Sequence, residues 1–166
     1  MLIDAFEVME KNCWVPCATL IIGLSGETDG DLELTIGLLE ELKSFKSLIV
    51  PLFLVSMGGL KDKAESFNIK NMTPKQAELF LKCWEHNIDW GQRLMQEYFW
   101  TKSGVRGYGL RFLLSYGSKE AKKLIRRCKE EYNYDLVAMI QDERSGKTTF
   151  GPAPIRFIYS YLHQNK

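Results

Sequence analysis

The sequence predicts an α/β fold in which a strand–helix–strand unit precedes a mostly α-helical extension. Residues 17–24 and 48–55 are short, continuously apolar stretches, which are typical of parallel strands covered on both faces. Residues 28–45, which lie between them, carry leucine and isoleucine at helical spacing. The chain therefore divides into an α/β portion, residues 1–60, and a helical extension, residues 72–166.

The elements of the α/β portion have clear boundary signals. Residues 2–12 are predicted to be the end of a helix, which stops before Pro16 because proline biases the preceding residue away from helical backbone. Thr28 and Asp31 have capping-box-like spacing at the start of the central helix. Pro51 has no N–H to donate, so its strand is predicted to lie at a sheet edge or to contain a bulge.

The helical extension begins with three predicted helices. The first begins at Thr73, with Pro74 in its first turn and Gln76 closing a capping box. The second covers 105–116 and the third begins at Ser118. The apolar face of the first helix is predicted to consist of Ala77, Phe80, Leu81, Trp84, Ile88, Gly91, Leu94 and Tyr98. The end of the chain is predicted as helix or strand over 136–140, a turn-rich loop over 145–154 and a short helix over 155–163.

Charge is distributed unevenly along the chain, although the net charge is only +1. Residues 1–41 contain nine acidic side chains and one lysine, whereas residues 102–129 contain nine basic side chains and one glutamate. One interpretation is two solvated helical surfaces of opposite sign. The alternative is that residues 102–129 meet an anionic partner, such as the phosphate headgroups of a lipid surface or a nucleic acid. No strong nucleic-acid signal accompanies this basic block.

The four cysteines, Cys13, Cys17, Cys83 and Cys128, show no disulfide-like spacing. The start of the chain lacks the pattern of a secretory signal, and no apolar run reaches the roughly 18 to 20 residues that cross a bilayer. We therefore expect a cytoplasmic protein with free thiols. Cys83 and Cys128 are predicted to point inward as small apolar residues, and without a fourfold cysteine set we expect no zinc site.

The most distinctive local segment is Gly-Leu-Ser-Gly-Glu-Thr, residues 23–28, directly after the first strand. Glycines at the carboxyl end of a parallel strand let a ligand approach the backbone, and the next helix's amino terminus favours an anionic group. The segment lacks the lysine of a phosphate-binding loop. A tight strand-to-helix turn and a nucleotide-binding loop are the two alternatives, and Glu27 is predicted to be a hydrogen-bonding turn residue rather than a general acid.

The segment resembles the G-[FL]-P-G-E-T segment of radical SAM enzymes, which lies around the fifth strand of their partial (β/α)₆ barrel. Ser25 stands where proline is usual. The wider stretch 14–61, including 49–53 and 57–62, is similar to an archaeal-type group of these enzymes, which often carry a cobalamin-binding domain ahead of the barrel. The resemblance implies that residues 1–60 are the late strands of a radical SAM barrel.

The resemblance also implies cofactors and site residues. In the family, a [4Fe–4S] cluster held by three cysteines reduces S-adenosylmethionine to a radical that abstracts hydrogen from the substrate, and cobalamin is a candidate second cofactor. The implied S-adenosylmethionine contacts are Ile21, Ile22, Gly23, Gly26 and Glu27. The implied substrate-facing residues are Val55, Ser56 and Gly58.

The cluster motif C-x₃-C-x₂-C is missing from the chain. Cys13 and Cys17 have its first spacing, but Leu20 occupies the third position and the pair precedes a late strand. Two parallel strands also need their faces and edges covered. We therefore expect the carboxyl-terminal portion of an enzyme, inactive alone and completed by an amino-terminal half in the same gene or a separate chain. The alternative is a stand-alone helical interaction module with a basic face.

The remaining chemistry-bearing residues give weaker predictions. His86 falls opposite Trp84 and Ile88 on its helix and is expected to be exposed, and His163 lies near the terminus. A group of aromatic residues is predicted to be core, or alternatively an interfacial surface interleaved with Arg106 and Arg111. This group comprises Tyr98, Phe99, Trp100, Tyr108, Phe112 and Tyr116.

Overall fold

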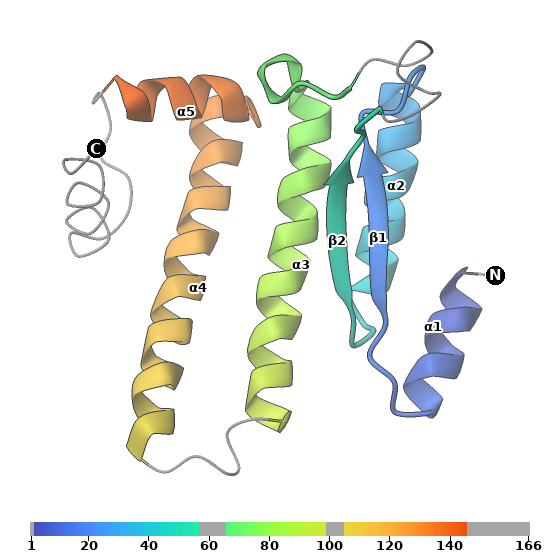
Figure 1. Ribbon diagram of the computed structural model, residues 1–166, viewed down its shortest axis with the longest axis vertical. Coiled ribbons are helices and arrows are strands. Elements are labelled where there is room, and N and C mark those ends of the chain that lie inside the picture. The colour runs from blue at the N-terminus through green and yellow to red at the C-terminus, as the bar shows by residue number, and fades with distance from the viewer. Residues whose placement is uncertain (1, 57–65, 99–104, 146–166) are drawn as a thin grey trace.

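The computed structural model describes residues 2–56, 66–98 and 105–145, which form a mostly helical α/β structure (Figure 1). The two strands form one parallel sheet accompanied by five α-helices in the described residues. The predicted α/β fold class is confirmed, and the described residues do not show a barrel. In chain order the elements are α1 (Leu2–Lys11), β1 (Cys17–Ile22), α2 (Asp29–Leu42), β2 (Leu48–Phe53), η2 (Ile69–Asn71), α3 (Pro74–Tyr98), α4 (Val105–Tyr132) and α5 (Leu136–Arg144).

The strands β1 and β2 pair in one uninterrupted parallel register. Leu48 N donates to Pro16 O at 3.0 Å, and Leu54 N donates to Ile22 O at 3.1 Å, so the ladder extends to both strand ends. In a parallel ladder, successive residues of a strand direct their backbone groups to opposite sides. The even-numbered residues of both strands therefore face the neighbouring strand, and the odd-numbered residues face the two outer edges of the sheet.

The outer edge of β2 is closed by a side chain of α3. Asn87 Oδ1 accepts from Ile49 N at 2.7 Å, and Asn87 Nδ2 donates to Ile49 O at 2.5 Å. Pro51 is the next odd-numbered residue, so the N–H that proline lacks would have faced this edge and the β1–β2 ladder loses no bond. The prediction that Pro51 marks an edge strand is confirmed for the described sheet, and the strand contains no bulge.

One face of the sheet is covered by helices and the other is open. Ile22 and Ile49 are 0% and 1% exposed on the covered face, whereas Ile21 and Leu52 are 50% and 45% exposed on the other. The expectation of strands covered on both faces is therefore wrong for the described residues. The buried cluster on the covered face, called the sheet core below, consists of Phe6, Ile22, Leu32, Leu39, Leu42, Ile49, Leu79 and Cys83.

Helix α3 packs on the sheet with a different face from the predicted one. Cys83, His86 and Trp90 are buried at helical spacing, and Trp90 Nε1 donates to Lys43 O at 3.1 Å. Trp84 is 48% exposed. The expected exposure of His86 is thus wrong, because α3 contacts neighbours on two sides and the side facing the sheet is not its most continuous apolar stripe.

The helices α3, α4 and α5 share a second, smaller core. It consists of Leu81, Cys128 and Met139 and is called the helical core below. Helix α4 runs without interruption through Gly117, where two separate helices were predicted, and residues 136–140 belong to α5 rather than to a strand. The predictions for 146–154 and 155–163 lie outside the described residues. Within the described part of the chain, no helix combines the length and apolarity needed to cross a bilayer.

Candidate functional site

The loop between β1 and α2 is held in shape by the carboxylate of Glu27. Its Oε2 accepts from Gly23 N at 3.0 Å and from Nε2 of Gln76, in the first turn of α3, at 3.2 Å. Glu27 N in turn donates to Leu24 O at 3.1 Å. The prediction that Glu27 is a hydrogen-bonding turn residue is confirmed, since its carboxylate ties the loop to itself and to α3.

The amino terminus of α2 carries its own anionic group. Thr28 N donates to Asp31 Oδ2 at 3.0 Å and Asp31 N donates to Thr28 Oγ1 at 3.3 Å, which is the predicted capping box. Hydrogen bonds from the Thr28 side chain and backbone lower the pKa of Asp31 below its ordinary value. A carboxylate therefore already occupies the position where this loop was predicted to favour an anionic ligand.

The two glycines of the loop have different surroundings. Both have positive φ, +85° at Gly23 and +83° at Gly26, a conformation that favours glycine. A Cβ on Gly23 would lie 2.2 Å from Phe67 Cδ2, so the space beside this backbone is filled by the chain's own ring. A Cβ on Gly26 would meet nothing within 4 Å. Of these two loop glycines, Gly26 therefore leaves its backbone open as predicted for ligand approach, and Gly23 does not.

A shallow pocket of about 310 Å³ lies beside this loop and includes three predicted cofactor contacts, Ile21, Gly26 and Glu27. The side chain of Ile22 is 0% exposed and points into the sheet core, so a ligand on the open face meets only its backbone. The other residues lining the pocket are Leu20, Leu24, Ser25, Asp31, Thr35 and Leu79.

The predicted substrate-facing residues follow β2. Val55 is 62% exposed, whereas Ser56 is 9% exposed and its N–H donates to Ser66 Oγ at 3.0 Å. Gly58 lies outside the described residues. The structure therefore places Val55 at the surface and turns Ser56 toward its own chain.

The histidine of α3 lies at the opposite end of the sheet from the loop. His86 Nε2 is 2.9 Å from the hydroxyl of Ser47, which directly precedes β2, and both side chains are buried. Burial lowers the pKa of His86, so the neutral ring is favoured. Because the loop follows the carboxyl end of β1 and Ser47 precedes the amino end of β2, this pair has a structural role and is not part of the loop site.

The cysteines are all free thiols, two exposed and two buried. Burial raises the pKa of Cys83 to about 12 and that of Cys128 to about 11, so these thiols stay protonated at neutral pH. Their predicted inward orientation is confirmed. The described residues contain no group of three or more histidine, cysteine, aspartate or glutamate side chains arranged to hold a metal ion.

Much of the basic block on α4 is paired with acidic side chains. Lys122 contacts Asp89 of α3, and Arg127 Nη1 donates to Glu143 of α5 at 3.1 Å. These pairs hold α4 to its neighbours, which partly accounts for the basic block without an external anion. Lys119, Lys123 and Arg126 remain exposed on α4.

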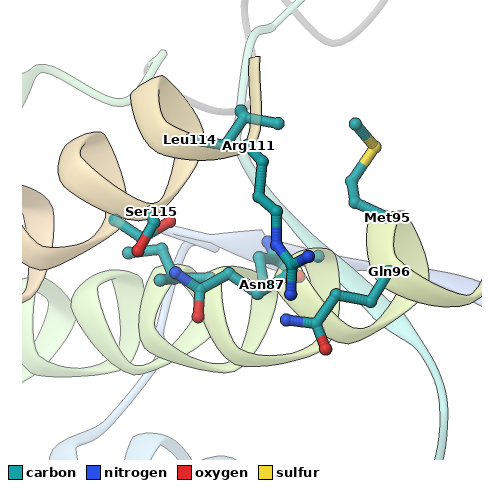
Figure 2. A pocket seen from close by; sticks show the side chains of 10 residues that line it. Asn87, Met95, Gln96, Arg111, Leu114 and Ser115 are labelled. Atoms are coloured by element: carbon teal, nitrogen blue, oxygen red, sulfur yellow. The ribbon is translucent and has the colours of Figure 1, made fainter. Parts of the chain in front are cut away.

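A second pocket, of about 360 Å³, lies between α3 and α4 (Figure 2). Figure 2 shows the guanidinium of Arg111 directed toward the side of α3 that carries Asn87 and Gln96. The pocket was not predicted from the sequence, because each helix contributes only a mixed polar and apolar strip to it. The lining contains one cation and several amides and hydroxyls, so it suits binding rather than proton transfer. The remaining lining residues are Ile88, Gly91, Gln92, Met95, Leu114, Ser115 and Ser118.

Comparison with known proteins gives no match: no family model fits the chain, and no curated protein or solved structure is significantly similar to it. The candidate functional site consists of the open face of the sheet together with Gly26 and Glu27, which follow the end of β1.

Proposed function

We propose that this chain is the carboxyl-terminal portion of a radical SAM enzyme, supplying two late strands of the barrel and a helical cap. The cluster-binding half would lie in another segment of the protein or in a separate chain. The observation that carries the proposal is the difference between the two outer edges of the sheet. All four cysteines are free thiols, which supports a cytoplasmic setting for the complete enzyme.

The sheet can grow at only one of its edges. Thr19 and Ile21 direct their N–H and C=O groups away from β2, and these groups have no partner among the described residues. The opposite edge is closed by Asn87 and Pro51. A further strand can therefore pair only beside β1, which is where a preceding strand would lie if β1 and β2 were the fifth and sixth strands of a partial barrel.

The two faces of the sheet support the same assignment. In a (β/α) barrel the helices form an outer ring and the other face of each strand points inward. Helices α2 and α3 lie on one face, and the open face carries Ile21, Leu48, Val50 and Leu52. This apolar open face is the proposed barrel interior.

The residues of the open face suit S-adenosylmethionine, whereas the cysteines of this chain do not suit a [4Fe–4S] cluster. Ile21 offers an apolar contact for the adenine ring, and the free backbone at Gly26 allows close approach. When bound with its cluster, S-adenosylmethionine supplies the radical chemistry. The cysteines do not fit the cluster, because Cys83 and Cys128 are buried and Leu20 replaces the third ligand after Cys13 and Cys17. Cobalamin remains a proposed second cofactor of the missing half.

The first test is anaerobic reconstitution of the purified chain with iron and sulfide. We expect no stable [4Fe–4S] absorption from this chain alone. A stoichiometric cluster on it would contradict the assignment of its cysteines and with it the proposal.

The second test uses the free edge of β1. Thr19→Pro removes an N–H that faces outward and leaves the β1–β2 ladder intact, whereas Thr19→Val keeps the N–H. The chain is co-expressed with the polypeptide segment that precedes it or is encoded beside it and carries C-x₃-C-x₂-C. We expect Thr19→Val to copurify with this segment and Thr19→Pro to lose it while melting at the same temperature alone. Absence of any such segment, or equal copurification of both variants, would refute the proposal.

A further inference from the structure

The outer face of α4 carries a continuous stripe of exposed side chains. Tyr108, Phe112 and Tyr116 follow one another at four-residue spacing and are 71%, 70% and 41% exposed. The rings of Phe112 and Tyr116 are stacked, with centroids 6.3 Å apart. The prediction that these three aromatic residues belong to the core is therefore wrong, and their partners Tyr98, Phe99 and Trp100 lie outside the residues whose side chains are described.

The stripe continues toward the carboxyl end of α4 as a basic surface. Lys119, Lys123 and Arg126 follow Tyr116 at spacings of three and four residues, which keep them on the same side of the helix. All three are exposed. Lys123 pairs with Glu120 at 2.7 Å, but this is a surface pair with 69% of the lysine side chain exposed, so it exchanges readily for another anion.

The opposite side of α4 is the side that packs against the protein. Cys128 is buried in the helical core, and Ile125 packs against that core. The stripe therefore points away from α3 and is not needed to hold α4 in place. Three large aromatic side chains exposed in a row on a helix that is already packed on its other side indicate an interaction surface.

We propose that this stripe of α4, Tyr108, Phe112, Tyr116, Lys119, Lys123 and Arg126, binds the surface of an anionic lipid bilayer with the helix lying parallel to it. The aromatic rings enter the headgroup region, where tyrosine places an apolar body and a polar hydroxyl, and the basic side chains reach lipid phosphates.

The separation of aromatic and basic residues favours a lipid surface over a nucleic acid. A nucleic acid needs cations along the whole contact to neutralise its phosphates. Along the stripe, the aromatic side chains Tyr108, Phe112 and Tyr116 come first and the basic side chains follow, and Arg111, which lies among the aromatic residues in sequence, is directed toward α3 instead (Figure 2). The surface stands independently of the radical SAM proposal, because it uses neither the sheet nor the loop after β1.

The test is cosedimentation of the full chain with phosphatidylcholine vesicles that contain or lack phosphatidylglycerol. We expect binding to the phosphatidylglycerol vesicles that weakens as salt is raised. Tyr108→Ala with Phe112→Ala should lower the partition coefficient at least about tenfold, because both rings lose their burial. Lys119→Glu with Arg126→Glu should lower it by more than about tenfold.

Matched controls lie on other elements. Leu34→Ala removes an apolar side chain that is 77% exposed on α2, and Lys70→Glu reverses an exposed charge in η2, so both should bind as the original chain does. Circular dichroism and melting check that each variant is folded. No vesicle binding, equal binding to both vesicle types, or equal loss in the Leu34 and Lys70 controls would overturn the proposal. Salt-sensitive binding to single- or double-stranded DNA without vesicle binding would assign the surface to nucleic acid instead.

Discussion

The sheet core and the helical core differ in size and in how they are completed. The sheet core contains eight buried side chains from five elements, whereas the helical core contains Leu81, Cys128 and Met139. Polar side chains also bond directly to the backbone around the sheet, as Asn87 does to Ile49. Around the helical core, side-chain pairs such as Arg127–Glu143 connect the helices. The sheet core should therefore determine global stability, and the helical core a more local part of it.

Helix α3 belongs to both cores at once. Leu79 and Cys83 are buried in the sheet core, and Leu81, between them, is buried in the helical core. Phe80 packs against both. Because α3 is held on the sheet by the sheet core, loss of the sheet core should also release the helical core, whereas α4 and α5 can detach while α3 stays on the sheet (Figure 1).

The largest expected effect comes from truncating the sheet core. Ile49→Ala should lower the free energy of unfolding by about 3–5 kcal/mol, because Ile49 is 1% exposed and its neighbours on β1, α2 and α3 cannot close the cavity. Met139→Ala should cost about 2 kcal/mol, since the smaller helical core collapses more easily. Urea unfolding followed by circular dichroism measures both.

Hydrogen exchange separates the two cases. Ile49→Ala should raise exchange throughout the described helices, whereas Met139→Ala should raise it in α4 and α5 and leave β1 and β2 protected. If Met139→Ala destabilises the strands as much as the helices, the two cores unfold as one cooperative unit, and the helical core does not open on its own.

The next effect tests the closed edge of β2. Asn87→Ala leaves the N–H and C=O of Ile49 without their bonds to the amide and should cost about 1–3 kcal/mol. Asn87→Asp keeps the acceptor for Ile49 N and loses only the donor to Ile49 O, so it should lower the stability less than Asn87→Ala does. Thermal melting at neutral pH gives the order of stability of the original chain and the two variants. If Asn87→Ala is as stable as the original chain, water replaces the amide at no cost.

A smaller effect depends on pH and arises at His86. Burial holds the pKa of His86 below the 6.5 of an unfolded chain, so the unfolded state binds the proton first as pH falls. Stability from this residue is complete above pH 6.5 and declines as pH falls below that value toward the lower folded pKa. His86→Gln should remove this part of the decline. Urea midpoints measured through the acidic range test it, and an unchanged pH profile in His86→Gln would place the titrating group elsewhere.

The elements of the fold could be predicted because their signals are local. The apolar runs of β1 and β2, the capping box at Thr28 and the start of α3 at Thr73 depend on neighbours within a few residues. The burial of His86 depends on the hydroxyl of Ser47, which is 39 residues away in sequence. No pattern along the helix itself carries that information.

The candidate site was predicted less completely for the same reason. Gly23 was expected to open the backbone to a ligand, but Phe67 fills that space from a distant segment. The closed edge at Asn87 required knowledge of which helix passes β2. Side-chain alternation does predict that Ile21 and Ile22 face opposite sides of a strand, while only the packing of α2 and α3 shows which side is open.

The smallest expected effect concerns the ion pairs of the helical extension. Arg127 donates to Glu131 in its own helix at 2.8 Å and to Glu143 of α5 at 3.1 Å, and its guanidinium carbon lies 5.9 Å from the centroid of the Tyr132 ring. Because Glu131 is largely exposed, Arg127→Gln should cost less than about 1 kcal/mol in global stability. Arg126→Gln, at the exposed neighbouring position, is the matched control and should change stability by less than about 0.5 kcal/mol. Amide hydrogen exchange at the start of α5 is the sharper measurement. Faster exchange in Arg127→Gln than in Arg126→Gln would show that the Arg127–Glu143 pair holds α5 to α4. Equal exchange in both variants would leave Met139 as the principal attachment of α5.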